Sequence, residues 1–328
     1  MKTIIEKIGI AVLLSSVIAS CSSPSATTLA SGGPELIAIK ADNTGNASNV
    51  WNLQNANNIT NISFTPVFVN MKPSDFITSP AGLLGQTTMS WQASAYDDLN
   101  KKYAVSIGES IVIYDLTSAT IPTPVTYVLA PPTAAASNRA LAMEYVGGQL
   151  FVIQNNDIKK FTAGTLTSVG LPVPSSGVNS DTMSNMTKNG TKIHFILIGR
   201  LYIFDTTAMT LSTVAVSGWS AAIDYNGLEY YAGKIYCAKR TSLSTTILDQ
   251  LVSIDLAGNE IIIPLTLPYF KDFSRISSAL DPINRLYYIS SSNGFSTNLN
   301  TLTKVDLSTG LNTSTSVLGY QFGLQYKD

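Results

Sequence analysis

A short motif from the second half of the chain returns near its C-terminal end without the strand that follows it. Residues 227–230, Gly-Leu-Glu-Tyr, are followed by a turn and a strand at 234–237, whereas residues 323–326, Gly-Leu-Gln-Tyr, are followed by Lys327 and Asp328. A strand that could supply the missing half, residues 35–40, lies at the other end of the sequence. A repeat that is split in this way predicts a closed ring, in which the last strand completes the first unit.

The same kind of unit recurs along the chain. A strand with an aromatic side chain or a histidine near its start appears at spacings of 42 to 51 residues, and its marker residues are Tyr103, Phe151, His194, Tyr236 and Tyr287. A tight turn precedes each of these strands, and a third and a fourth strand follow it. Short alternating strands separated by turns are typical of all-β folds, and a period of about 40–50 residues indicates a propeller.

Five whole units and the split one predict a single six-bladed β-propeller of four-stranded blades over residues 35–328, closed by pairing of residues 322–326 with residues 36–39. Residues 302–310, Leu-Thr-Lys-Val-Asp-Leu-Ser-Thr-Gly, resemble the YVTN-type β-propeller repeat of bacterial proteins. The resemblance implies the fold. It implies no function, because propellers host many unrelated activities.

The N-terminal residues 1–20 have the features of a signal peptide. Lys2 and Lys7 form a basic segment before an apolar run at residues 8–18, which is too short for a spanning helix. Residues 18–21, Ile-Ala-Ser-Cys, resemble the bacterial lipoprotein box, which implies that Cys21 is lipidated and that residues 21–34 form a flexible tether. An ordinary signal peptide with an incidental cysteine is the alternative. We expect a protein of the bacterial envelope, anchored by its lipid in the outer membrane.

The charge composition of the chain limits the classes of partner that it can bind. Charged residues make up 12% of the chain and the formal net charge is −1, with no basic cluster, which argues against nucleic acid as a partner. We expect a monomer without a cofactor.

Single reactive-looking residues have structural explanations at this stage. His194 stands at a marker position that is aromatic in the other units, which predicts packing rather than catalysis. Cys237 lies within a strand, which predicts a buried, inert thiol. Four third strands end in an aspartate that can accept a hydrogen bond from the backbone two residues on, and these are Asp115, Asp205, Asp255 and Asp306. We therefore predict no catalytic residue and no metal ligand.

Loop lengths predict where a partner would bind. The loops from the second to the third strand are long at residues 40–49, 238–249 and 290–300, and the longest connection between blades is residues 70–88. Such loops emerge on one face of a propeller, and functional loops often sit on a rigid scaffold. Candidate contacts on this face are Trp219, Arg240, Tyr269, Phe270, Phe273 and Phe295.

A second group of candidates comes from the expected starts of the innermost strands, where side chains should circle one opening of the axial channel. These residues are Trp91, Arg139, Asp181 (beside Thr182), Asp224, Arg275 and Tyr320. One interpretation is that the arginines pair with the aspartates and close the channel. The other is a small polar pocket for an anionic or sugar-like ligand.

The sequence therefore favours a non-enzymatic, lipid-anchored envelope protein that binds protein or glycan through its loop-bearing face. The alternative is a metal-dependent hydrolase similar to six-bladed lactonases, whose central ion would be held near Asp181, Asp224 and Asn226. An envelope assembly factor is a third hypothesis. Two or more carboxylates converging on one point of the axis would distinguish the hydrolase from the binding protein.

Overall fold

The protein is described from a computed structural model. All described residues belong to one compact unit, Pro34–Asp328. They are residues 35–41, 47–54, 63–66, 93–107, 110–117, 125–129, 140–174, 183–243, 246–267, 276–292, 299–318 and 320–327. Residues 1–34, for which the sequence predicts a signal peptide and a tether, lie outside this set.

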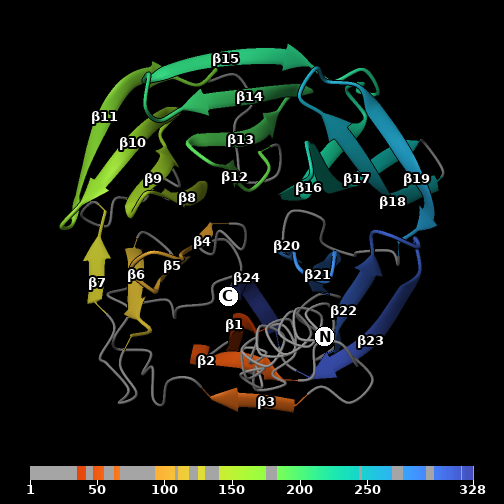
Figure 1. Cartoon of the computed structure of the whole chain (residues 1–328), viewed down its shortest axis with the longest axis horizontal. Coiled ribbons are helices and arrows are strands. Elements are labelled where there is room, and N and C mark those ends of the chain that lie inside the picture. The colour runs from red at the N-terminus through yellow and green to blue at the C-terminus, as the bar shows by residue number, and fades with distance from the viewer. Residues whose placement is uncertain are drawn as a thin grey trace, which may run out of the picture. The chain divides into compact units, whose positions relative to one another are not determined.

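The described residues form an all-β propeller of four-stranded antiparallel sheets (Figure 1). Five sheets consist of four strands consecutive in sequence. They are β4 (Ser94–Asp97), β5 (Lys102–Ile107), β6 (Ser110–Asp115) and β7 (Val125–Val128); β8 (Ala142–Val146), β9 (Gln149–Gln154), β10 (Asp157–Thr162) and β11 (Thr165–Pro172); β12 (Thr187–Asn189), β13 (Lys192–Leu197), β14 (Arg200–Asp205) and β15 (Thr210–Ala215); β16 (Ile223–Tyr231), β17 (Lys234–Leu243), β18 (Thr246–Asp255) and β19 (Glu260–Thr266); and β20 (Ser277–Asp281), β21 (Leu286–Ser292), β22 (Leu299–Asp306) and β23 (Asn312–Leu318).

A further four-stranded sheet combines strands from both ends of the unit, in the order β24-β1-β2-β3. Strand β24 (Tyr320–Lys327) lies antiparallel to β1 (Glu35–Ala41), with Leu36 opposite Tyr326, and β2 (Ala47–Gln54) and β3 (Ser63–Pro66) follow outward. The innermost strands of successive sheets are neighbours: β4 with β8, β8 with β12, β12 with β16, β16 with β20, β20 with β24, and β24 with β4.

Two faces follow from this topology. Each of the innermost strands β4, β8, β12, β16 and β20 starts after the segment that connects it to the preceding sheet and ends at the turn to the second strand. We call the first edge the loop face, because the turns from second to third strands also lie there. The opposite edge, with the turns from first to second strands, is the short-turn face.

The repeated Gly-Leu-Glx-Tyr motif makes the same contacts in both copies. Gly227 and Gly323 have left-handed φ angles of +69° and +65°. The Tyr287 hydroxyl donates to the Gly227 carbonyl at 2.7 Å, and the Tyr103 hydroxyl donates to the Gly323 carbonyl at 2.6 Å. A Cβ atom at Gly227 would lie 2.8 Å from the Tyr287 hydroxyl, and one at Gly323 would lie 2.3 Å from that of Tyr103. Both the conformation and the close approach therefore require glycine.

The third residue of the motif joins neighbouring sheets. The Ser278 hydroxyl of β20 donates to Glu229 Oε1 of β16 at 2.8 Å. In the other copy, Gln325 Nε2 of β24 donates to Ser94 Oγ of β4 at 3.0 Å. The backbone N–H of Leu324 also donates to Ser277 Oγ of β20 at 2.6 Å, so β24 is bonded to the sheets on both of its sides.

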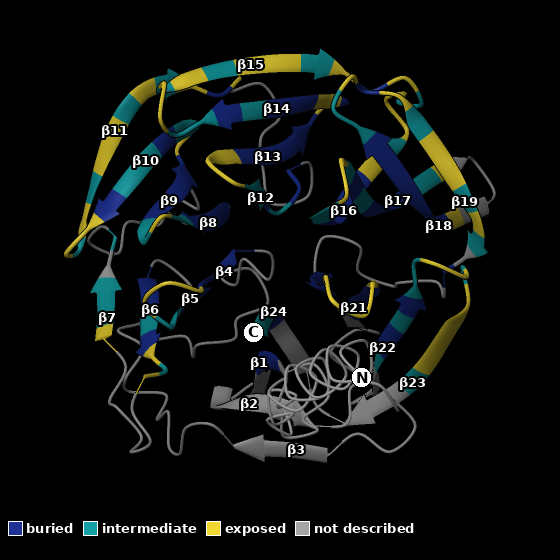
Figure 2. Cartoon of the chain, viewed as in Figure 1, coloured by how far each residue is buried: buried dark blue, intermediate teal, exposed yellow. Residues whose placement is uncertain are grey.

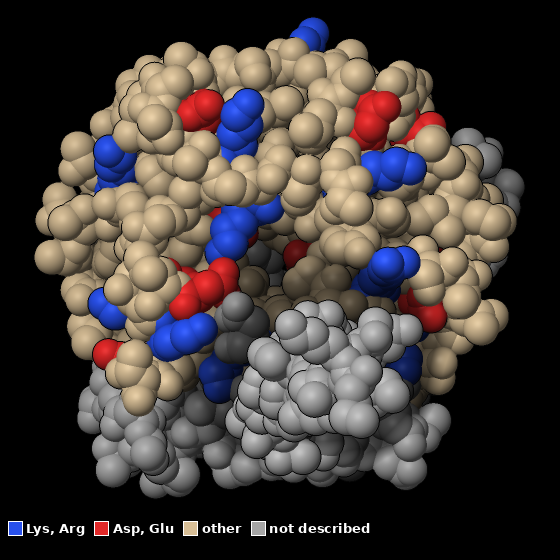
Figure 3. Space-filling model, in the orientation of Figure 1, with Lys and Arg blue, Asp and Glu red and all other residues tan. Residues whose placement is uncertain are grey.

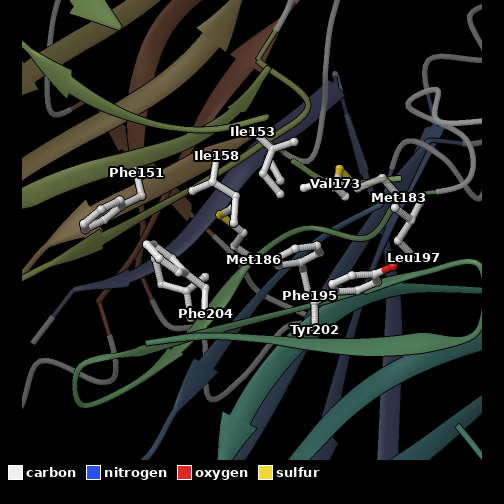
Figure 4. Close-up of a cluster of buried hydrophobic side chains, with 12 residues drawn as sticks. Phe151, Ile153, Ile158, Val173, Met183, Met186, Phe195, Leu197, Tyr202 and Phe204 are labelled. Carbon is white, nitrogen blue, oxygen red and sulfur yellow. The ribbon is translucent and has the colours of Figure 1, made fainter. Parts of the chain in front are cut away.

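The apolar core lies between neighbouring sheets. In Figure 4, Phe151 and Ile158 of the β8–β11 sheet face Phe195 and Phe204 of the β12–β15 sheet and Met186, which directly precedes β12. The rings of Phe151 and Phe204 meet edge to face, with centroids 5.3 Å apart. Full burial of one such side chain contributes about 1.5–3 kcal/mol. Because the core lies between the sheets, the inner strands are largely buried, whereas the outermost strands β11, β15 and β19 alternate between exposed and half-buried residues (Figure 2).

The structural interpretations of the reactive-looking residues are confirmed. His194 is fully buried and stacks on Tyr230 with ring centroids 5.7 Å apart, and burial lowers its pKa to about 4, so the ring is neutral. Cys237 is fully buried, and burial raises the pKa of its thiol. Each third-strand aspartate accepts a hydrogen bond from the backbone N–H two residues on; the acceptors are Asp115, Asp205, Asp255 and Asp306.

The predicted loop at 238–249 is wrong. Strands β17 and β18 pair continuously from Lys234 with Asp255 to Leu243 with Thr246, so this segment is a long hairpin. Residues at both ends of the other two predicted loops are also paired, with Lys40 opposite Asn49 and Ser292 opposite Asn300. The spacing between strands suggested loops, but the ladders extend into the residues at the ends of each predicted segment.

Candidate functional site

A groove opens at the loop face between the β12–β15 sheet and the β16–β19 sheet. Its cavity volume is about 200 Å³, and it is lined by Ile196, Ile198, Gly199, Trp219, Ala221, Ile223, Asp224 and Tyr225. These residues come from the end of β13, the β13–β14 turn, the segment between the sheets and the first residues of β16. A mostly apolar groove with a carboxylate can bind a ligand that has both an apolar face and polar groups.

The indole ring of Trp219 is held in place by its surroundings. Its Nε1–H donates to the Ile223 carbonyl at 3.1 Å. The ring lies directly against Gly199, which has a φ angle of +63° and where a Cβ atom would lie only 2.0 Å from the indole Cδ2. The ring therefore rests on the backbone of the β13–β14 turn. A side chain that is already fixed loses little entropy when a ligand binds to it.

A buried ion pair, Lys239 with Glu260, contacts one groove residue and the backbone next to another. The Tyr225 hydroxyl donates to one oxygen of Glu260, and Lys239 Nζ lies 2.5 Å from the other. Lys239 also donates to the Gly218 carbonyl at 3.2 Å, next to Trp219. The side chains of Lys239 and Glu260 are 7% and 4% exposed. The network links Tyr225 to the backbone beside Trp219 through Glu260 and Lys239. Breaking it is costly, because removal of one partner of the ion pair leaves a buried charge unpaired.

Arg240, a predicted ligand contact, lies in the β17–β18 hairpin beside the groove. Its Nε and Nη2 atoms donate to the two carboxylate oxygens of Asp249, each at 2.7 Å. The backbone register places Arg240 opposite Asp224. Arg240 is thus held in a two-pronged ion pair with a fully buried carboxylate, and it is not among the residues that line the groove.

The structure brings together two of the residues proposed from the sequence, Trp219 and Asp224. Tyr320 begins β24 as expected, but its side chain is not described. The remaining candidates lie outside the described residues and stay predictions: Trp91, Arg139, Asp181, Arg275, Tyr269, Phe270, Phe273 and Phe295.

The expected starts of four innermost strands are wrong by two to five residues, since β4, β8, β12 and β20 begin at Ser94, Ala142, Thr187 and Ser277. The physical reason is that these innermost strands are only three to five residues long, so a fixed count back from the marker residue runs past their starts.

A polar cluster near the axis was missed by the sequence reasoning. Lys188 Nζ of β12 lies 3.1 Å from Asp98 Oδ2 and 3.5 Å from Glu144 Oε1 of β8, and it donates to the Tyr96 carbonyl of β4 at 3.2 Å. Figure 3 shows acidic and basic side chains close to a central hollow of the molecule. One lysine therefore connects three of the innermost strands toward the short-turn face.

Two glutamates on innermost strands have perturbed acidity. Burial raises the pKa of Glu144 to about 7, with Lys188 opposing the shift, and burial raises the pKa of Glu229 to about 8. The register places Glu144 opposite the marker Phe151 and Glu229 opposite the marker Tyr236. A glutamate directly across from a marker aromatic is the sequence signal that could have revealed this cluster.

Within the described ranges, no three His, Cys, Asp or Glu side chains are grouped so that they could hold a metal ion. Asn226 is buried and its Oδ1 accepts the Gly227 N–H, while Asp181 falls in the gap at 175–182, so the hydrolase alternative stays a prediction. The described part of the chain also contains no helix of the length and hydropathy that a membrane span needs.

Comparison with known proteins shows the fold alone. The sequence matches no protein-family model and no curated protein. Among solved structures, TolB from Acinetobacter baumannii is similar with a TM-score of 0.57 and 12% identity, over 89% of this chain and 66% of TolB. A protein from Lactobacillus plantarum is similar with a TM-score of 0.51 and 9% identity, over 90% of this chain and 100% of that one. The chain thus spans slightly less than two thirds of the TolB chain.

Proposed function

We propose that this protein is a lipid-anchored, non-enzymatic binding protein of a bacterial envelope. Its ligand, a protein or a glycan, binds in the groove at the loop face. The observation that carries the proposal is the groove itself, in which a fixed indole, Trp219, and an exposed carboxylate, Asp224, share one apolar surface. An apolar side chain of a peptide, or the apolar face of a sugar ring, packs on the indole, while Asp224 accepts hydrogen bonds from the ligand's polar groups.

The scaffold of the proposal is one closed ring of six blades with repeats of the YVTN type. Support comes from the sheet that joins β24 to β1, and from the sequence of neighbouring innermost strands, which returns from β24 to β4. The hydrogen bonds of Tyr103 to Gly323 and of Gln325 to Ser94 join the tail strand to the next sheet. A closed ring leaves no unpaired sheet edge at the junction of the chain ends.

The anchor of the proposal is a lipid on Cys21. The support is the lipoprotein-like run at residues 18–21 after a basic and apolar leader. Ser22 follows the cysteine, which in lipoproteins with this box is compatible with sorting to the outer membrane.

Binding can be tested without a known ligand by screening the full chain against a random-peptide display library and an array of bacterial glycans. Any binder is then titrated against Trp219→Ala, Asp224→Ala and the control Leu248→Ala, an exposed apolar residue outside the groove. We expect Trp219→Ala to weaken binding at least tenfold, which is about 1.4 kcal/mol, and the control to have no effect. Equal affinity of all variants, or no binder in either screen, would refute the proposed site.

A further inference from the structure

Two turns on the short-turn face have the same unusual construction. The β4–β5 turn reads Asp-Asp-Leu-Asn-Lys at residues 97–101, and the β20–β21 turn reads Asp-Pro-Ile-Asn-Arg at residues 281–285. The buried carboxylate of Asp97 accepts the Leu99 N–H at 3.1 Å, and that of Asp281 accepts the Ile283 N–H at 2.9 Å. In each turn the asparagine side chain also donates to the aspartate at 2.7 Å.

These rigid turns hold aliphatic side chains out in solvent. Leu99 is 73% exposed and Ile283 is 76% exposed. A basic residue follows each of them at the same distance, Lys101 in the first turn and Arg285 in the second. A single exposed aliphatic residue is ordinary, but two equivalent tips, each two residues before a cation, form a repeated feature. Leu311, 72% exposed in the β22–β23 turn, lies on the same face.

The two turns flank the place where the chain enters the propeller. Strand β24 neighbours both β20 and β4. The first residue of β1, Glu35, pairs with Lys327 at the end of β24, which is the edge where β4 and β20 end. Figure 2 shows the exposed turns after β4 and after β20 on either side of β24. The first described residue, Glu35, therefore enters the propeller between the two turns.

We propose that the short-turn face, defined by Leu99, Lys101, Ile283 and Arg285, rests on the membrane in which the protein is anchored. This inference depends on the lipid anchor of the proposed function. The flexible tether that the sequence predicts at residues 21–34 would have a root-mean-square reach of about 20 Å, which would keep this face close to the bilayer. The aliphatic tips enter the boundary between headgroups and acyl chains, and the adjacent cations contact anionic headgroups.

The orientation has a consequence for the ligand groove. The groove lies at the start of β16, around Ile223 and Asp224, and therefore at the loop face. With the short-turn face on the bilayer, the groove is directed away from the membrane and stays accessible to a partner while the protein is anchored.

The test uses the full lipidated chain on vesicles of phosphatidylethanolamine and phosphatidylglycerol. An environment-sensitive fluorophore is attached through Leu99→Cys or Ile283→Cys, and through the control Leu248→Cys in β18 near the loop face. Cys237 is fully buried and takes no label in the folded protein. We expect a blue-shifted emission and a several-fold loss of quenching by aqueous iodide at 99 and 283, and no change at 248.

The outcomes separate the inference from the anchor. If the protein floats with the vesicles but all three labels are quenched equally, the anchor stands and the orientation is refuted. If labels at 99 and 283 are shielded equally well without vesicles, a second copy or a protein partner covers this face, and the proposal is also refuted. If the chain does not carry a lipid, the anchor fails. The labelled protein is then mixed with the same vesicles at high lipid concentration, and an unchanged emission at both turns refutes the membrane contact.

Discussion

Glu229 should make the folded protein less stable as the pH rises. It lies on an innermost strand, accepts a hydrogen bond from the Ser278 hydroxyl at 2.8 Å, and has a pKa that burial raises from 4.5 to about 8. A carboxyl group with a higher pKa in the folded state binds its proton more tightly there than in the unfolded chain. Its contribution is therefore fully favourable below pH 4.5 and is lost progressively up to about pH 8.

The magnitude follows from the difference between these two pKa values. One pKa unit corresponds to about 1.4 kcal/mol, so ionisation of Glu229 costs about 3–5 kcal/mol of folding free energy above pH 8. Glu229→Gln removes the ionisation and keeps the shape. Gln325 occupies the equivalent position in β24 and bonds to Ser94, so the fold already accepts glutamine there. We expect the variant to match the wild type near pH 5 and to be more stable by about 3–5 kcal/mol near pH 8.5.

The assay is urea unfolding followed by tryptophan fluorescence, at several values between about pH 5 and pH 8.5. Asp115→Asn is the matched control. Asp115 is exposed and its pKa is lowered by hydrogen bonds from Thr117, so its substitution should not alter the slope over this range. Glu144, with a pKa of about 7, leaves a residual slope in the Glu229→Gln variant. A constant difference in unfolding free energy between wild type and Glu229→Gln across the range would refute the reasoning.

Three further predictions concern the ring, the groove and the anchor. Removal of residues 319–328 takes away β24 and exposes two sheet edges, so we expect the protein to be insoluble in a sedimentation assay or multimeric on gel filtration. A soluble monomer with an unchanged Tm would contradict the closed ring. Gly199→Ala places a Cβ against the Trp219 indole at a left-handed φ, and should cost about 1–3 kcal/mol in chemical unfolding and weaken ligand binding, whereas Gly190→Ala, at a left-handed φ with no atom within 4 Å, should lose stability alone. Cys21→Ala should move the protein from the membrane to the soluble fraction on cell fractionation; continued membrane association with a cleaved signal would mean that a partner holds it.

Much of the scaffold could be predicted from the sequence because its local signals and its long-range contacts agree. The marker residues Tyr103 and Tyr287 donate hydrogen bonds to Gly323 and Gly227. The repeated motif and the marker residues are therefore the two sides of the same contact between sheets. The third-strand aspartates were predictable because their hydrogen bonds span two residues of sequence.

The site was harder to predict because it depends on side chains from different sheets. Residue type pointed to Trp219 and a strand start pointed to Asp224. Nothing in their spacing shows that Gly199 of another sheet packs against the indole. The two acidic partners of Lys188 could not be predicted for the same reason, since Asp98 and Glu144 belong to two other sheets. The hairpin at 238–249 resembles a loop in the sequence because most of its residues are polar, although its two strands pair along their length.

The most direct measurement of ligand binding in the groove is fluorine NMR of protein labelled with 5-fluorotryptophan. The chain has three tryptophans, and Trp219→Phe assigns the resonance of the groove residue. On titration with a peptide or glycan from the screens, we predict that the Trp219 resonance shifts with saturation at the measured Kd, because the ligand packs on the indole. A ligand that binds fully while the Trp219 resonance stays unchanged would contradict the account.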